Sequence, residues 1–284
     1  MSVTLKESTL KKLDTLVTAS SFTDQHVNKE YRFTDEKTIR LITPTTVPLV
    51  DYDPTGTGDR FGGNNELQDT NKTYTITQDK AFKLTIDRVN YIQGGRAKEA
   101  AKILKAQIDE RVTPALDKYR LGVAADGAAT AQQTVTFDED NAYDNILDLG
   151  VYLAEAKLSG TRKVLYIDPT FYKLVKKEIV TDSAASGSAD KLVGKGYMGM
   201  LDGTPVRVVP SEYFRTGVRA LLVDEKALLG PEQINHARII TDSELVDGVV
   251  IVGRYVYDAF ILGSRAKGVA AVVDSSYTPP VPSA

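Results

Sequence analysis

TYTITQDKAFKLTID, residues 73–87, alternates apolar and polar side chains almost without a break. Such alternation is typical of strands with one buried face. The apolar side chains of the two runs are Tyr74 and Ile76, then Phe82, Leu84 and Ile86. If the two runs form a hairpin, the alternation pairs Ile76 with Phe82 and Tyr74 with Leu84. Because a two-stranded ribbon alone is marginal in water, its apolar face needs a further surface to pack on.

The residues before this stretch predict a strand followed by a long loop. Residues 38–43 read as the strand. Pro44, Pro48 and Pro54 then exclude a helix or a central strand, and glycines alternate with Asp and Asn from residue 56 to 63. A turn-rich loop of this length is uncommon inside a domain and is usually functional.

The residues after it predict a long helix. From Gly94, apolar residues recur at spacings of three, four and seven, which is one stripe of a helix. The pattern runs to about residue 126, with Gly127 as the stop. Pro114 lies inside it and is expected to bend the helix, since it lacks a backbone donor.

The remainder reads as alternating short helices and strands, so the predicted fold class is α+β. Helices are expected at 141–158 and 169–179, with a mobile loop at 180–201. Strands are expected at 162–168, 204–210, 219–229, 234–242, 248–262 and 267–273.

The N-terminal residues 1–36 are polar with scattered apolar positions. Leu10, Leu13 and Leu16 have the spacing of a short amphipathic helix. We interpret the segment as an arm that needs a partner surface; the alternative is a disordered tail.

Composition excludes several classes of protein. The 284 residues have 42% hydrophobic content, enough for a sizeable core, and a formal net charge of −3, without the basic excess of a dedicated DNA-binding protein. There is no cysteine, hence no disulfide or thiolate metal site. No signal peptide or transmembrane segment is recognised, so we expect synthesis in a cytoplasm and no membrane partner.

The sequence has no recognisable motif for catalysis or for cofactor binding. The two histidines, His26 and His236, have no partner motif. The acidic residues Asp138, Glu139, Asp140 and Asp144 lack the spacing of a calcium loop. The glycine–lysine stretches 94–102 and 194–199 do not match a phosphate-binding loop, and there is no G-x-S-x-G. We therefore expect no enzyme, no metal and no cofactor. Asp87 and Arg88 directly follow the alternating stretch; we interpret them as a structural salt bridge at the joint to the following helix, and the alternative is a catalytic pair.

Four motifs in fixed order carry a resemblance to a known family. They are KTIRL (37–41), DYD (51–53), TITQDKAFKLTID (75–87) and PALDKYR (114–120), with MGMLDGTPVRVVP (198–210) further on. Their order resembles that of the major capsid proteins of tailed phages with the HK97 fold. Lys80 departs from the pattern, which often has arginine there.

The resemblance implies an HK97-like capsid fold with a division of the chain. Residues 1–36 are the N-terminal arm, 37–92 the extended loop, 93–141 and 231–275 the peripheral domain with its spine helix, 142–230 the axial domain, and 276–284 a C-terminal tail. In this reading the strands of 232–273 return to the peripheral sheet.

The resemblance also implies the function of a major capsid protein. Subunits would form pentamers and hexamers and then an icosahedral shell around double-stranded DNA, with a separate scaffolding protein and a portal, in the virion after assembly in the bacterial cytoplasm. A neighbouring subunit would supply the surface for the ribbon. The expected contact residues are Tyr74, Ile76, Asp79, Lys80, Phe82, Leu84, Ile86 and Arg88.

Three other readings stay open. The nearest is an encapsulin-like nanocompartment shell of the same fold with enzyme cargo. The others are a tail or adhesin component and an α/β enzyme with an unrecognised site.

Overall fold

The structure is a computed structural model. It describes residues 21–31, 37–52, 54–55, 60–62, 66, 68–88, 100–128, 132–134, 141–158, 160–185, 199–241 and 247–278. Some expectations from the sequence lie outside the described residues: the amphipathic stretch within 1–20, the start of the long helix at 94–99, the acidic residues 138–140, most of the loop at 180–201 and the last residues of the tail.

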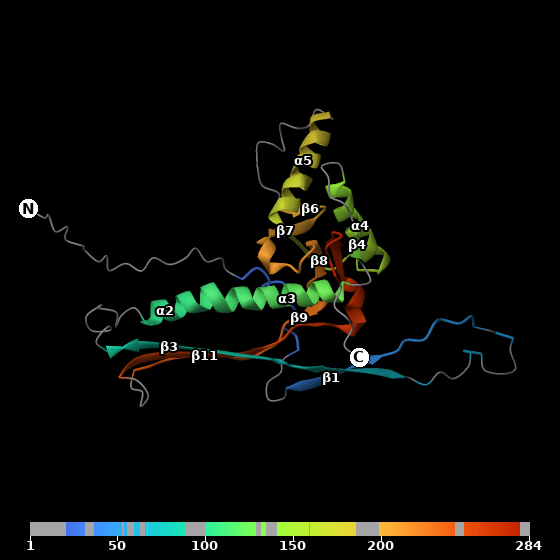
Figure 1. The fold of residues 1–284 in the computed structure, drawn as a ribbon. Coiled ribbons are helices and arrows are strands. Elements are labelled where there is room, and N and C mark those ends of the chain that lie inside the picture. Colours follow the sequence, from blue (N-terminus) through green and yellow to red (C-terminus); the bar gives the residue numbers. More distant parts are fainter. Residues whose placement is uncertain are drawn as a thin grey trace, which may run out of the picture.

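The described chain has an upright part and an elongated part (Figure 1). The upright part holds β4 (Gln132–Thr134), α4 (Ala142–Glu155), β5 (Lys163–Ile167), α5 (Pro169–Ala185), β6 (Met200–Leu201), β7 (Thr204–Val208), β8 (Val218–Asp224) and β13 (Val269–Val273). The elongated part holds β1 (Thr38–Pro44), β2 (Asp69–Thr75), β3 (Gln78–Asp87), α2 (Ala100–Gln107), η2 (Ile108–Val112), α3 (Thr113–Gly127), β10 (Glu232–Ile240) and β11 (Gly248–Tyr257). The short elements η3 (Ser211–Tyr213), β9 (Leu228–Leu229), β12 (Phe260–Ile261) and η4 (Gly263–Gly268) complete the described set.

The core of the upright part is a six-stranded sheet in the order β4-β13-β8-β5-β7-β6. Its two faces are covered by different helices. In β5, Val164 and Tyr166 pack in one cluster with the end of α3, whereas Leu165 and Ile167 pack in another with α4 and α5. Because both faces are buried, the central strands are nearly continuous apolar runs.

The predicted long helix is confirmed over the described residues 100–127, with α2, η2 and α3 following one another as one rod (Figure 1). The end at Gly127 is also confirmed. The regular α-helix of the rod is interrupted at η2, a π-helical turn directly before Thr113 and Pro114. Proline provides no amide donor and its ring crowds the carbonyl four residues earlier, which a wider turn relieves.

The hairpin expected within residues 73–87 does not form. β2 pairs with β1, with Tyr74 opposite Ile39. β3 pairs with β11, with Phe82 opposite Gly253 and Leu84 opposite Ile251. The two runs therefore belong to different sheets, and the predicted pairings of Ile76 with Phe82 and of Tyr74 with Leu84 are wrong.

The junction between the runs explains this outcome. A hairpin needs a tight reversal at residues 77–80, but the carboxylate of Asp258 accepts hydrogen bonds from the Thr77 amide (2.7 Å) and hydroxyl (2.9 Å). Tyr74 and Ile76 are buried at 5% exposure each, with Leu229, Val256 and Leu262. The chain is thus held against β11 and β12 and continues forward into β3.

The apolar face of β3 is covered by its own chain. Phe82, Leu84 and Ile86 pack with Ile103 and Leu104 of α2, and with Ala100, Val249 and Ile251. The surface that these side chains require is supplied here by the rod and β11, whereas the sequence analysis assigned it to a neighbouring subunit.

Three smaller expectations change. α5 continues to Ala185, so residues 180–185, expected in a loop, are helical. The strands predicted at 219–229 and 248–262 are each divided, into β8 and β9 and into β11 and β12. β13 does not join β10 and β11; it lies between β4 and β8. All five β13 residues are buried, which suits a strand of the six-stranded sheet because both faces of that sheet are covered.

The pairing of β3 with β11 predicts the effect of Gly253→Ala. A Cβ at Gly253 would overlap the Phe82 ring, which lies directly across the strand pair. We expect this variant to lose about 1–2 kcal/mol of unfolding free energy in urea denaturation, because the ring must move out of its packing.

Gly150→Ala in α4 is the matched control, because nothing lies within 4 Å of its added Cβ. It should be neutral or slightly stabilising, since alanine favours helix by about 0.5–1 kcal/mol over glycine. Equal stabilities for the two variants would contradict the observed strand pairing.

Candidate functional site

The described residues hold no group of three or more side chains able to bind a metal ion. Across the same residues, no helix has both the length and the apolar character to cross a membrane. His26 pairs with Glu225 at 3.0 Å, and His236 is exposed on β10. Asp168 is buried but accepts hydrogen bonds from the Thr170 and Ser211 hydroxyls and caps the start of α5. His26 and Asp168 are therefore occupied in structural contacts.

The densest set of long-range polar contacts comes from three residues of α3, namely Asp117, Tyr119 and Arg120. We call them the anchor residues. They fall within PALDKYR (114–120), one of the motifs that carried the resemblance. Asp117 and Arg120 both contact the segment at residues 21–24, and Arg120 also reaches β10. Tyr119 contacts Asp258, directly after β11.

Asp117 holds the segment at residues 21–23. Its carboxylate is 1% exposed. It accepts hydrogen bonds from the Ser21 hydroxyl (2.7 Å), the Phe22 amide (2.8 Å) and the Thr23 hydroxyl (2.5 Å). A buried carboxylate with several donors is stable only while all of them stay in place. The residues that follow the N-terminal twenty are therefore fixed to the rod.

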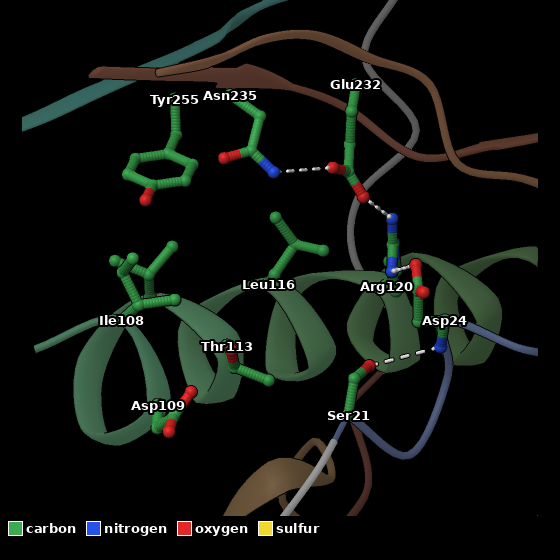
Figure 2. A pocket seen from close by; sticks show the side chains of 11 residues that line it. Ser21, Asp24, Ile108, Asp109, Thr113, Leu116, Arg120, Glu232, Asn235 and Tyr255 are labelled. Atoms are coloured by element: carbon green, nitrogen blue, oxygen red, sulfur yellow. Dashed lines mark hydrogen bonds and ion pairs between the residues drawn. The ribbon is translucent and has the colours of Figure 1, made fainter. Parts of the chain in front are cut away.

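Arg120 holds the same segment and β10. Its side chain is 1% exposed and pairs with Glu232 at 2.7 Å and Asp24 at 3.6 Å. Figure 2 shows it between these two carboxylates. Burial raises the pKa of the Asp24 carboxyl, but Lys29 and Arg120 outweigh this effect and lower that pKa overall.

Tyr119 connects the rod to the β2–β3 junction. Its hydroxyl donates to Asp258 at 2.7 Å, and Asp258 also binds Thr77. Burial, followed by the hydrogen bond and charge of Asp258, raises the pKa of Tyr119 from 10.0 to about 12. Asp258 is 2% exposed and has donors on each side, so the junction is fixed to both α3 and β11.

The structure places the predicted contact residues in two settings. Tyr74, Ile76, Phe82, Leu84 and Ile86 are the packed ones already described. The charged residues are exposed. Asp79 pairs with Arg254 at 2.6 Å, and the hydrogen bond from Arg254 lowers the pKa of Asp79. Arg88 pairs with Asp247 at 3.3 Å, so its salt bridge joins the end of β3 to the start of β11 and is not the one expected at the joint to the helix. Lys80 is exposed on β3.

The extended segment that includes β1 carries most of the exposed large apolar side chains. They are Ile42, Val47, Leu49, Val50, Tyr52 and Phe61, with exposures from 52% to 101%. We call them the loop apolar set. Tyr52 and Phe61 contact each other edge to face at 5.1 Å. A run of exposed apolar side chains of this kind marks an interaction surface. Sequence reasoning found the loop but did not single out these residues.

Asp258 and Glu232 were also missed. Asp258 interrupts the apolar run GVVIVGRYVYDAFIL (248–262), and a lone carboxylate inside such a run was the available signal.

The Asp117 contacts predict a stability loss for Asp117→Asn. The neutral amide accepts weaker hydrogen bonds and turns a donor toward other donors, so about 2–3 kcal/mol of unfolding free energy should be lost. Limited proteolysis should also cut faster within residues 21–31. The control is Asp109→Asn on the same rod, expected within about 0.5 kcal/mol of the parent. Equal losses in both variants would argue against the anchor.

The raised pKa of Tyr119 predicts a pH-dependent effect of Tyr119→Phe. The stabilising form is protonated, so its contribution is complete below pH 10.0 and disappears as the pH rises through about 12. We expect the variant to be less stable by about 1 kcal/mol at pH 8, and the difference from the parent to shrink at higher pH.

Tyr31→Phe is the control, because the Tyr31 hydroxyl has no hydrogen-bond partner among the described residues. In urea denaturation, the unfolding free energy of this variant should stay close to that of the parent both at pH 8 and at higher pH. A Tyr119→Phe difference that grows with pH would contradict the assignment.

No protein-family model matches this sequence, and no curated protein matches it at a significant level. Solved structures do match. A structure from Mycobacterium phage Che8 has a TM-score of 0.69 at 19% identity and covers 94% of this chain and 96% of its own. The mature capsid of bacteriophage PhiM1 has a TM-score of 0.72 at 13% identity, covering 98% and 93%.

The capsid of cyanophage P-SCSP1u has a TM-score of 0.71 at 14% identity and covers 96% of this chain and 93% of its own. At these identities the likeness concerns the fold, and it extends over nearly the whole length of both chains. The chain has the α+β fold of phage capsid structures.

Proposed function

We propose that this protein is the major capsid protein of a tailed phage and self-assembles into an icosahedral shell. The observation that carries the proposal is the full-length match to phage capsid structures, with both chains covered at 93% or more in the three reported cases. A match over the whole chain leaves little of either protein outside the shared architecture. The role is structural, and no catalytic site is invoked.

The loop apolar set supports self-assembly. Leu49 is 101% exposed and Phe61 80% exposed in the single chain. Burying a side chain of this size contributes about 1.5–3 kcal/mol, so leaving several in water is costly unless another molecule covers them. A loop that reaches from one subunit onto the next forms a heterologous contact, which closes into rings such as pentamers and hexamers.

The division of the chain follows the same proposal. Residues 1–36 are the arm, 37–92 the extended loop, and the rod is the spine helix of a peripheral domain that includes β10 and β11. The axial domain is the six-stranded sheet with α4 and α5, and it takes in β4 and β13 as well as residues 142–230, because β13 pairs with both β4 and β8. The exposed Asp79, Lys80 and Arg88 remain proposed contacts between subunits.

The proposed partners are further copies of the chain, a separate scaffolding protein, a portal and double-stranded DNA lining the inner face without sequence preference. A formal net charge of −3 suits a lining surface better than a tight DNA binder. Assembly would take place in the bacterial cytoplasm and the final location would be the virion capsid.

The second candidate is an encapsulin-like nanocompartment shell, since the same fold serves both roles. Neighbouring genes separate the two: a portal and terminase indicate a phage, and a peroxidase or ferritin-like protein indicates a compartment. An α/β enzyme would instead behave as a small oligomer with a pocket of convergent polar groups.

Negative-stain microscopy with light scattering on the purified protein tests the proposal. Pentamers, hexamers or closed shells are expected, and DNA within particles from infected cells would indicate the phage role. A monomer or dimer that is unaffected by concentration or by added scaffolding protein would overturn it.

The loop apolar set predicts an assembly defect without a folding defect. The double variant Leu49→Ser, Phe61→Ser should keep its unfolding free energy within about 0.5 kcal/mol of the parent, since both side chains are exposed in the single chain. Its critical concentration for assembly should rise at least about tenfold, because about 1.4 kcal/mol is a factor of ten.

Thr46→Ala on the same loop is the matched control and should assemble like the parent. Critical concentrations are measured by light scattering across a dilution series. Normal assembly of the serine variant would mean that the loop does not contact a neighbour.

A further inference from the structure

A groove of about 460 Å³ lies on the rod between the 21–24 segment and the β10–β11 sheet. Its floor is the apolar stripe Ile108, Val112 and Leu116, which repeats every four residues along the helix. All three side chains are half-buried. Figure 2 shows the polar walls, with Ser21 and Asp24 on one side and Asn235 and Tyr255 on the other.

One wall of the groove holds an unsatisfied buried group. Tyr255 is 5% exposed, and its hydroxyl has no hydrogen-bond partner among the described residues. In Figure 2 the hydroxyl points from the sheet toward the rod. A buried hydroxyl without a partner is costly and is uncommon in a folded protein. The groove therefore combines an apolar floor with a polar group that needs a partner.

The chain itself supplies a segment of matching character. Ser21 lines the groove and is fixed there by its hydrogen bond to Asp117 at 2.7 Å. The preceding twenty residues are therefore tethered at the groove through Ser21. In helical spacing, one face of that segment gathers the apolar side chains with a hydroxyl among them: Leu5, Thr9, Leu10, Leu13, Leu16 and Val17. Lys11 lies on the opposite face.

We propose that, in the free subunit, residues 1–20 bind as an amphipathic helix in this groove of the same chain. The inference does not rest on shell formation. The lengths agree: Ile108 to Leu116 spans about 12 Å and Leu10 to Leu16 about 9 Å at 1.5 Å per residue. With Ser21 at Asp117, the segment runs parallel to the rod and brings Leu16 beside Val112 and Leu13 beside Ile108. Its hydroxyl side chains are in reach of the Tyr255 side of the groove.

Disulfide trapping in the full chain tests this pairing. The protein has no cysteine, so a pair introduced by Leu13→Cys with Ile108→Cys reacts without background. The matched control is Lys11→Cys with Ile108→Cys, because residues 11 and 13 are close along the chain but lie on opposite helix faces. The pairs are oxidised in a glutathione buffer at low protein concentration and followed on non-reducing gels.

We expect the Leu13→Cys pair to form an intrachain disulfide at least tenfold faster than the Lys11→Cys pair. Equal rates would mean that the segment moves freely past the groove and would overturn the proposal. Crosslinked dimers in place of the intrachain product would also overturn it, since the groove would then bind the segment of a second copy.

A measurement on the unaltered protein covers the case in which Ile108→Cys does not fold. Hydrogen exchange of the unassembled subunit should show the backbone amides of residues 9–17 protected at least tenfold relative to a free peptide of residues 1–20. Exchange at the rate of the free peptide would overturn the proposal.

Discussion

The buried carboxylates of Asp117 and Asp258 hold the elongated part of the molecule together. Each carboxylate accepts hydrogen bonds from residues that lie far from it in the chain. Neither carboxylate can stay buried if those donors leave. Asp117 fixes the end of the N-terminal segment to α3, and Asp258 fixes the β2–β3 junction to the same helix. Arg120, buried and paired with Glu232, adds β10 to the set. The single helix α3 thereby positions the segment at residues 21–24, the β2–β3 junction and β10.

Some apolar surfaces of the chain are covered by other parts of the same chain, and others are left exposed. β3 packs beneath α2, and both faces of the six-stranded sheet are covered. The loop apolar set is left in water by the single chain. These exposed apolar side chains are the ones that a second molecule would cover in the proposed shell.

Local pattern predicted the types of most elements because periodicity reports the environment of a side chain. The period of the rod, the stop at Gly127 and the apolar runs of β5, β8 and β13 were all readable. The alternation in residues 73–87 correctly indicated extended chain with one apolar face. The prediction failed on which strands pair with each other, because the same alternation suits a hairpin or two strands in two different sheets. Asp258, which lies 181 residues from Thr77 in the chain, decides between the two arrangements.

The sequence by itself therefore determined an α+β fold, a long helix after a glycine-rich loop, and a motif order that resembles phage capsid proteins. It did not determine which surfaces would be buried by which segments. PALDKYR (114–120) was visible as a motif, but the roles of Asp117, Tyr119 and Arg120 come from residues about 95 to 140 positions away. Only the tertiary structure decided that the β3 face is covered from within and that the loop apolar set is not. The physical reason is that burial and hydrogen-bond satisfaction depend on long-range contacts, which local spacing does not encode.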